Sequence, residues 1–548
     1  MKNKGILRIV PIGGLGEVGK NMTIYEYGND IMIIDAGIMF PENDMIGIDY
    51  IIPDFENYLD DKKDRVRGII FTHGHEDHIG AIQHILKKIN TPIYATKLTR
   101  GLLEVKLNRY GMTGMADLRT VNAGDRVQIG SFKVDFFHVC HAIPDAVGLG
   151  IDTPAGLIVH TGDYKFDHTP VDNWPTDYAK LAEFAQRGVL ALLADSTNAT
   201  KPGWTQSEQV IDSALDQVFE EAQGRILVTT FASLISRMQQ VADAAQRHGR
   251  KVAFTGRSML DNMKMACELG YLEFPERLVI SLEKSLSLPD NKVVLMATGS
   301  QGEPRSIMGR LANGTNRKFD IREGDTIILS SQIIPGNEES VYRTINNLFR
   351  RGADVIYEDI APVHVSGHAS QEEMKLLLHL VRPKHLIPIH GELRMLKQHA
   401  KLAEEVGIPK ENIHVVENGQ IIEFTDGQCR IGERIPGDYI FVDGSGVGDV
   451  DKSIVRERES LGFDGILVVN ANISKKDGHL ISTPDILTRG FMLPEEFESI
   501  ADGLKRKVEQ TLAKSNGNPE SKILRAVKSY IYQETKRNPY IFVTVNRN

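Results

Sequence analysis

The stretch GIIFTHGHEDHIGAIQHIL, Gly68 to Leu86, decides the fold of this chain. It begins with the apolar residues of a buried strand, and a helix is expected from about Ile79. Between the two lie four candidate metal ligands within six residues: His73, His75, Asp77 and His78. Imidazole suits zinc, and a carboxylate beside imidazole suits a second, harder position in a two-metal site. The spacing predicts a metal centre on a loop at a strand's carboxyl end, with the first two residues turned to one ion and the last two to another.

Three other strand-like runs end in candidate ligands in the same way. The run FFHVCHAIPD offers His138 and His141, GLIVHTGD offers Asp163, and HLIPIHGE offers His390. His141 is favoured because it begins the loop, whereas His138 falls inside the strand-like run and stays open as the alternative. Asp35, which ends the run IMIID, is a candidate for an outer carboxylate that orients a liganding histidine.

The glycine loop GGLGEVGKN, Gly13 to Asn21, nearly matches two phosphate-binding signatures. It fits GxGxxG, and it fits GxxxxGK up to Asn21, where a P-loop requires Ser or Thr. Both signatures need a helix next, because a helix N-terminus supplies the anion-binding amides. Residues 22–34 instead indicate a strand, a turn and a second strand. A nucleotide site is therefore disfavoured, and the glycines are expected to allow a close approach of another segment.

The bulk composition bounds the class of protein. A chain of 548 residues predicts two to four domains. No apolar run is long enough to span a membrane, the N-terminal MKNKGILRIV lacks the apolar region of a secretion signal, and three scattered cysteines suit a reducing cytosol, so a cytoplasmic protein is expected. The net charge of −9 argues against indiscriminate nucleic-acid binding. Residues 501–548 carry a local charge of +6, for which solvated helix faces are the simplest interpretation.

An insertion separates the candidate ligands, since Asp163 and His390 are 227 residues apart. Between Ser207 and Ile360, helix-like and strand-like runs alternate, which predicts a parallel α/β domain. Its strands end in the loops TFASLIS, ATGSQGEP and SSQIIPGN, and ligands bind at such carboxyl ends. The expected domains are 1–206 and 361–430, which share one core, the inserted domain 207–360, a linker 431–451, and a small α/β domain 452–548.

These motifs carry a family resemblance. The HxHxDH motif, followed by His141, Asp163 and the distant His390, resembles the metallo-β-lactamase superfamily. The resemblance implies an αββα sandwich with a binuclear metal site at one edge. One metal would be held by His73, His75 and His141, the other by Asp77, His78 and His390, with Asp163 bridging the two.

The inserted α/β domain resembles the β-CASP subgroup, whose members cleave RNA or DNA. Asp195 in LLADSTN matches its motif A, His368 in HVSGHAS its motif B, and His390 its motif C. Together GGLGEVGKN, DAGIMFPE, THGHEDHIGA and PIHGE resemble the ribonuclease J family over essentially the whole chain. The resemblance implies a metal-dependent ribonuclease that acts on single-stranded RNA, both from the 5′ end and internally, in rRNA maturation and mRNA decay. A β-CASP DNA nuclease and a weakly active scaffold subunit of an RNA-decay complex remain alternatives.

The resemblance also implies roles for residues and cofactors. Two zinc ions per chain, with manganese or magnesium as alternatives, would supply a hydroxide that attacks the phosphodiester. His368 would give a proton to the leaving oxygen while Asp195 holds its ring, although an uninvolved loop histidine is the simpler alternative. The RNA's 5′-monophosphate and terminal nucleotide would contact two segments: Ser233, Leu234 and Ile235; and His364, Val365, Ser366, Gly367 and His368.

Two further expectations come from the same resemblance. Gly47, Asp49 and Asp443 offer oxygen ligands that would suit a structural calcium ion, although surface aspartates explain them equally well. The C-terminal domain is expected to assemble the chain into a homodimer or homotetramer, and partners from an RNA-decay complex are expected.

Overall fold

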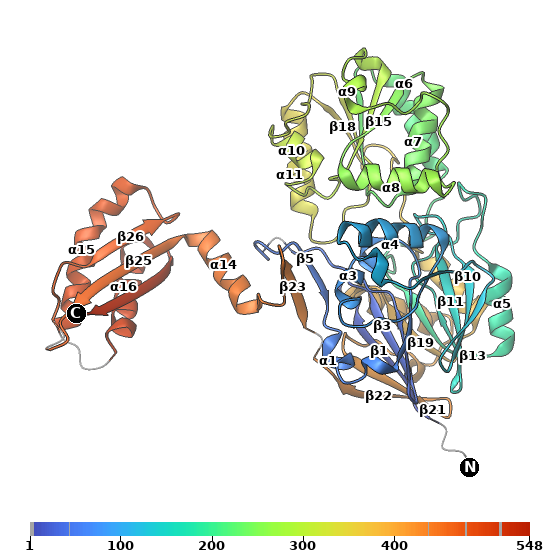
Figure 1. The fold of residues 1–548 in the computed structure, drawn as a ribbon, viewed down its shortest axis with the longest axis horizontal. Helices are drawn as coiled ribbons and strands as arrows, with labels where there is room; N and C mark the ends of the chain where they lie inside the picture. The colour runs from blue at the N-terminus through green and yellow to red at the C-terminus, as the bar shows by residue number, and fades with distance from the viewer. Residues whose placement is uncertain (1–4, 43, 437, 477–478, 514–517) are drawn as a thin grey trace. The chain divides into compact units, whose positions relative to one another are not determined.

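The computed structural model describes residues 5–42, 44–436, 438–476, 479–513 and 518–548 (Figure 1). The chain divides into two compact units, the first made of residues 1–40 and 51–440, the second of residues 41–50 and 441–548. In the part of the chain that is described, no helix has the length and apolar character needed to cross a membrane.

Two β-sheets face each other in the first unit. One has the order β22-β21-β1-β3-β4-β6-β7-β8 and the other the order β19-β13-β12-β11-β10-β9. The strands of the first sheet are β1 (Leu7–Gly13), β3 (Met22–Tyr27), β4 (Asp30–Ile34), β6 (Val66–Ile70), β7 (Ile93–Ala95), β8 (Leu118–Thr120), β21 (Gln420–Thr425) and β22 (Gln428–Arg434). Those of the second are β9 (Arg126–Ile129), β10 (Phe132–His138), β11 (Val147–Thr153), β12 (Gly156–His160), β13 (Val189–Asp195) and β19 (His385–Ile389).

Three buried cores show the layering of these sheets. One core joins Ile34 and Ile70 of the first sheet to Phe136 and Leu149 of the second, so the sheets pack face to face. The outer face of the first sheet packs on α3 (Ile82–Ile85) and α4 (Lys97–Arg109). The outer face of the second sheet packs on α5 (Tyr178–Arg187), α12 (Gln371–Val381) and α13 (Leu393–Glu405). This confirms the predicted αββα sandwich. Short elements complete it: α1 (Glu56–Leu59), α2 (Glu76–Ile79), β2 (Leu15–Gly16) and β20 (Gly391–Glu392). The short strand β5 (Tyr50–Pro53) belongs to a separate sheet of order β24-β23-β5.

The glycine loop opens no nucleotide-binding fold. It leads from β1 through β2 directly into β3, with no helix between them. Leu15 of β2 pairs with Gly391 of β20, so the loop lies beside the turn that carries His390. A Cβ on Gly13 would stand 1.9 Å from the backbone oxygen of Lys20, which shows why a side chain is excluded there.

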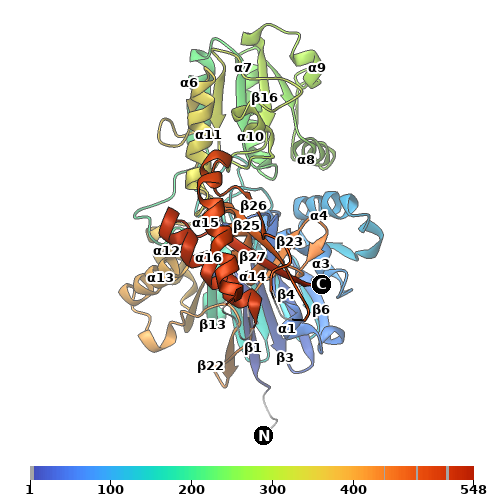
Figure 2. The ribbon, with the colours of Figure 1, turned by 90° about the vertical axis from the view of Figure 1, so that its left-hand side faces the viewer.

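The inserted domain is a five-stranded parallel sheet of order β15-β16-β14-β17-β18, as the alternating pattern predicts. It forms a lobe of its own in Figures 1 and 2. One face packs on α6–α8 and the other on α9–α11. The bounds are α6 (Val210–Glu221), β14 (Ile226–Thr229), α7 (Ile235–Arg247), β15 (Lys251–Phe254), α8 (Arg257–Glu268), α9 (Leu282–Ser285), β16 (Val293–Ala297), α10 (Ile307–Ala312), β17 (Thr326–Leu329), α11 (Glu338–Arg350) and β18 (Asp354–Ile356).

The second unit contains the expected small α/β module. β25 (Ile466–Ile473) pairs in parallel with β27 (Tyr540–Arg547) and antiparallel with β26 (Asp485–Arg489). Alternate residues of β25 are buried under α15 (Pro494–Ala513) and α16 (Pro519–Thr535), which lie side by side in Figure 2. The structure adds β26 and α14 (Lys452–Asp464), which the sequence reading did not include.

Much of the segment 431–451, which was expected to be a linker, lies in paired β-strands. Its start continues β22, which returns along β21 after a turn at Asp426 and Gly427. The rest contains β23 (Tyr439–Asp443) and β24 (Gly446–Val447), which form a hairpin. The sequence signal was present, because DG and DGSG are turn residues between β-branched or aromatic runs.

Candidate metal centre

The predicted ligands come together at the carboxyl ends of β6, β10, β12 and β19. Among the described residues, their donor atoms fall into groups whose members lie within 4.8 Å of one another. The groups are His73, His75 and His141; Asp77, His78, Asp163 and His390; and Asp163, Asp195, His368 and His390. Asp163 and His390 belong to both the second and the third group. Oδ2 of Asp163 also lies 3.5 Å from Nε2 of His73 in the first group, so the groups form one continuous centre.

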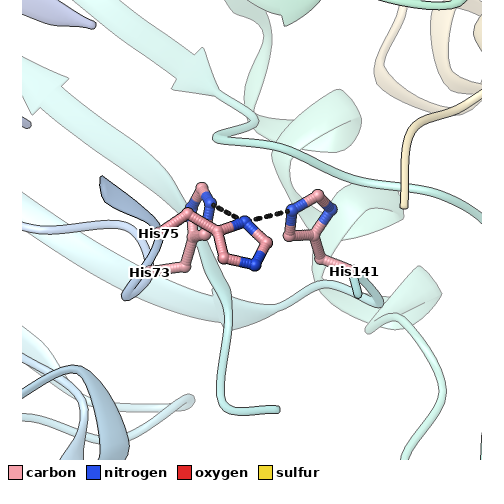
Figure 3. Close-up of side chains that lie close together, drawn as sticks. All are labelled: His73, His75 and His141. Carbon is pink, nitrogen blue, oxygen red and sulfur yellow. Dashed lines mark hydrogen bonds between the residues drawn. The ribbon is translucent and has the colours of Figure 1, made fainter. Parts of the chain in front are cut away.

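The three-histidine cluster, His73, His75 and His141, turns three imidazole nitrogens to one point (Figure 3). Nδ1 of His75 lies 3.2 Å from Nε2 of His73 and 3.1 Å from Nε2 of His141. Burial lowers the pKa of His73 and of His141 well below the usual value, and that of His75 to about 4. The three rings are therefore neutral, which is the form that binds zinc.

The mixed cluster consists of Asp77, His78, Asp163 and His390. Oδ2 of Asp163 lies 3.2 Å from Nε2 of His78 and 3.5 Å from Nε2 of His73, so Asp163 stands between the two clusters. Nε2 of His390 lies 3.4 Å from Oδ2 of Asp77. This buried nitrogen has no hydrogen-bond partner among the described residues. An unpartnered nitrogen facing a carboxylate fits a bound cation.

The charge balance of the mixed cluster also fits a bound cation. Burial favours neutral rings, yet Asp163 raises the pKa of His78 and of His390 well above the usual value, with Asp77 adding to the effect. Without another cation these imidazoles take up protons to balance the carboxylates. A metal ion bound here would replace those protons, so the residues present fit a two-metal centre.

Asp35 has the predicted outer position. Its Oδ2 lies 2.8 Å from Nδ1 of His78, and it also accepts hydrogen bonds from the backbone and hydroxyl of Thr72. This contact turns Nε2 of His78 inward. Asp35 and His390 both adopt positive φ, at 61° and 50°, a conformation that non-glycine residues hold only where the surroundings enforce it.

The helix expected from about Ile79 begins at Glu76 instead, as the short α2. Asp77 and His78 therefore sit in its first turn, where acidic side chains are favoured by the helix dipole. The glycine loop supports this turn, because the backbone N–H of Asn21 donates to the carbonyl of Asp77 over 2.9 Å. Gly37 packs so closely that a Cβ there would stand 1.6 Å from the same oxygen.

His138, the alternative ligand, lies away from the centre. Its Nδ1 is 3.0 Å from the carbonyl of Pro175. Its ring stacks on Trp174 with a centroid distance of 3.9 Å and an interplanar angle of 4°. The structure thus brings His141, and not His138, to the cluster.

A His–Asp pair lies beside the metal centre. Nδ1 of His368 is 2.8 Å from Oδ2 of Asp195, at the end of β13. Although burial opposes ionisation, His368 helps to hold the pKa of Asp195 below its usual value. The carboxylate therefore accepts the Nδ1 proton, and Nε2 of His368 is left to exchange a proton elsewhere.

The two candidate substrate segments lie at the start of α7 and just before α12. Ser233 to Ile235 lead into the first turn of α7. In the second segment, His364 is 8% exposed, and its Nδ1 lacks a hydrogen-bond partner within the described chain. Burial, followed by the charges of Arg237 and Lys165, lowers the pKa of His364 well below the usual value. Both cations are also paired with buried carboxylates, Arg237 with Glu208 over 2.7 Å and Lys165 with Asp167 over 3.5 Å.

Two residues that hold the second segment in place were not predicted from the sequence. Asn198 donates to Oγ of Ser366 over 2.8 Å and to the carbonyl of His368 over 3.0 Å. Thr205 donates to the same carbonyl over 2.7 Å. Asn198 ends the motif LLADSTN and could have been found there, whereas no local signal marks Thr205.

The calcium candidates lie in the second unit. Asp443 is paired with Arg458 over 2.7 Å, and Asp49 accepts a hydrogen bond from the backbone of Gly444 over 2.8 Å. A Cβ on Gly47 would stand 2.8 Å from Nη1 of Arg458. Within the described residues these aspartates belong to no group of three close donors. The calcium ion therefore stays a prediction.

Comparison with known proteins adds four family models that together cover most of the chain. They are the metallo-beta-lactamase superfamily at residues 15–186, the ribonuclease J beta-CASP domain at 223–348, the Zn-dependent metallo-hydrolase RNA specificity domain at 352–416, and the ribonuclease J C-terminal domain at 453–548. A crystal structure of a protein of unknown function from Enterococcus faecalis is similar in fold, with a TM-score of 0.54 and 16% identity, over 76% of this chain and all of that one.

Two curated relatives match along nearly their whole length. "Ribonuclease J2" of Bacillus subtilis is 42% identical over 98% of each chain. "Ribonuclease J" of Thermus thermophilus is 42% identical over 97% of this chain and 92% of its own. With this similarity and the metal centre described above, the chain belongs to the ribonuclease J family of metal-dependent nucleases.

Proposed function

We propose that this chain is a ribonuclease that degrades single-stranded RNA from a 5′-monophosphorylated end and also cuts it internally, in rRNA maturation and mRNA decay. The observation that carries the proposal is the His368–Asp195 pair beside a centre of seven metal-ligating side chains. The intact ligand set argues against a weakly active scaffold. A DNA nuclease remains the rival, since discrimination depends on contacts to the 2′-hydroxyl.

The proposed ligands divide by cluster. His73, His75 and His141 would hold one ion, and Asp77, His78 and His390 the other, with Asp163 between them. Two zinc ions are proposed, with manganese or magnesium as alternatives. When bound, they supply a strong nucleophile from water at neutral pH and neutralise charge on the phosphodiester.

The role of proton donor is assigned to His368. Its Nδ1 proton is engaged by Asp195, so Nε2 is the atom that would give a proton to the departing oxygen. Asp195 would stabilise the charged ring before transfer and keep it oriented. Asp195 is fully buried at the end of β13, and the carbonyl of His368 accepts hydrogen bonds from Asn198 and Thr205, which limits the motion of both residues.

The 5′ end would be held by the two substrate segments. The first turn of α7 presents backbone N–H groups, which favour an anion together with the hydroxyl of Ser233. Nδ1 of His364 and the Ser366 region would complete the contacts. A monophosphate fits such a pocket, whereas a triphosphate would move the next linkage off the metal centre.

The direct test compares substrates in one assay. A 5′-monophosphorylated RNA, the same RNA with a 5′-triphosphate, and single-stranded DNA of the same sequence are incubated with and without a chelator. We expect the fastest decay of the first, slower internal cleavage of the second, no cleavage of the DNA, and no cleavage of any substrate with chelator. Equal decay of the DNA would favour the rival nuclease, and decay that resists the chelator would overturn the metal-dependent mechanism.

A double change should isolate the 5′-end pocket. Hydrogen bonds to a charged group contribute about 1.5–3 kcal/mol each. The change Ser233→Ala with Ser366→Ala should therefore slow exonucleolytic decay of 5′-monophosphorylated RNA by tens-fold or more. A circular RNA of the same sequence has no end to hold, so its internal cleavage should suffer less. Equal slowing of both RNAs would show that this pocket does not read the 5′ end.

The C-terminal domain would join chains into a homodimer or homotetramer, decay-complex partners would bind the assembled protein, and the protein would act in the cytoplasm. Light scattering of the full chain, compared with a chain ending at residue 451, tests the first point.

A further inference from the structure

The loop that returns from the inserted domain, residues 363–369, touches the three-histidine cluster directly. We call these residues the return segment. The carbonyl of Gly367 accepts a 2.7 Å hydrogen bond from Nδ1 of His141. Because a carbonyl oxygen can only accept, Nδ1 carries the proton and Nε2 keeps its lone pair for the cluster. Gly367 thus selects the tautomer of His141 that can bind a metal.

The contact leaves no room for a side chain at position 367. A Cβ there would stand 2.6 Å from Nδ1 and Cε1 of His141 and 2.9 Å from Cβ of Ala142. Real Cβ atoms essentially never approach so closely, so one of the neighbours would have to move. Gly367 is not in the positive-φ region, so close packing, rather than backbone conformation, requires glycine here.

The return segment is held from both sides. At its start, the carbonyl of Val363 accepts bonds of 2.9 Å from Arg237 on α7 and 2.7 Å from Ser330 after β17. At its end, the N–H of Ala369 donates over 2.7 Å to the carbonyl of Tyr164, the residue after Asp163. These bonds tie the return segment to the inserted domain at its start and to the residue after Asp163 at its end, and Gly367 lies between them.

We propose that Gly367 is a positioning residue that couples binding of the substrate's 5′-phosphate at the return segment to metal binding at the three-histidine cluster. The inference rests on the proposed two-metal centre and phosphate pocket. A phosphate held by the segment and by Ser233 fixes the segment where Gly367 orients His141. Linkage makes the effect reciprocal, so a metal ion at the cluster must favour the phosphate by the same factor.

The test measures zinc affinity by competition with a fluorescent chelator, with and without adenosine 5′-monophosphate as the probe. Wild-type protein should bind two ions, one of them about fivefold or more tightly when the nucleotide is present. Gly367→Ala should weaken one ion by roughly 10–100-fold, as loss of an outer contact to a metal ligand does, and should abolish the nucleotide's effect. The matched control is Gly114→Ala, whose added Cβ meets nothing within 4 Å.

A second variant covers the case in which Gly367→Ala does not fold. Ser330→Ala removes one anchor of Val363 without touching a metal ligand, and it should reduce the nucleotide's effect while both ions remain bound. Two ions at wild-type affinity in Gly367→Ala, with an undiminished nucleotide effect, would overturn the inference alone. A wild-type protein with no zinc at the three-histidine cluster would overturn the proposed centre and the inference with it.

Discussion

Changing Asp163→Ala should remove both metal ions and lower RNA cleavage by roughly 10⁴-fold or more. Each ion contributes several kcal/mol to the transition state, and each 1.4 kcal/mol corresponds to about tenfold in rate. Asp163 lies 3.5 Å from His73, 3.2 Å from His78 and 3.0 Å from His390, so its loss affects both clusters. Elemental analysis of freshly purified protein gives the metal count, with two ions per chain expected in the wild type.

Asp77→Ala provides the internal comparison. Asp77 belongs to the mixed cluster only, so this variant should keep the ion of the three-histidine cluster and lose the other. The free energy of unfolding, measured on metal-free samples, separates metal loss from misfolding. If Asp163→Ala retained both ions, Asp163 would not be the bridging ligand.

Changing His368→Ala should slow cleavage by roughly 10²- to 10⁴-fold while leaving the metal content unchanged. That range is the usual contribution of a general acid. We expect the metal to stay because Nδ1 of His368 is bonded to Asp195 and lies 4.0 Å from Asp163, although the four donors Asp163, Asp195, His368 and His390 also form a group of their own. Single-turnover cleavage of saturating RNA measures the chemical step, and elemental analysis measures the metal.

His379→Ala is the matched control, since this histidine is exposed on α12. It should change neither the rate nor the metal content. Loss of metal in His368→Ala, in parallel with activity, would mean that His368 is a ligand and that the proton donor lies elsewhere.

The ligand set could be predicted from the sequence because each ligand follows a strand-like run. The buried strand, the turn and the polar residue are all local signals, and parallel strands bring their carboxyl ends to one edge. The choice of His141 over His138 rested on such a signal, and the structure brings His141 to the cluster while His138 stacks on Trp174. The order of helices and strands in the inserted domain could be predicted for the same reason, because each element is marked by its own run of residues.

The contacts that orient those ligands could not be predicted in this way. Gly367 and His141 are 226 residues apart, and their bond joins a backbone carbonyl, which every residue possesses, to a ring nitrogen. Arg237 reaches the carbonyl of Val363 across 126 residues. No spacing rule relates such pairs, since they depend on how the inserted domain and the sandwich pack together.

The order of the sandwich strands along the chain determines when the sandwich can close during translation. β1 pairs with β21, with Leu7 opposite Phe424, and β13 pairs with β19 only after the whole inserted domain has been made. A ribosome therefore releases the three-histidine cluster early, but His368 and His390 arrive late. Until then the nascent chain lacks one proposed ligand of the second ion, His390, and the proposed proton donor, His368. On the proposed roles, the chain would therefore be unable to cleave RNA before its sandwich is closed.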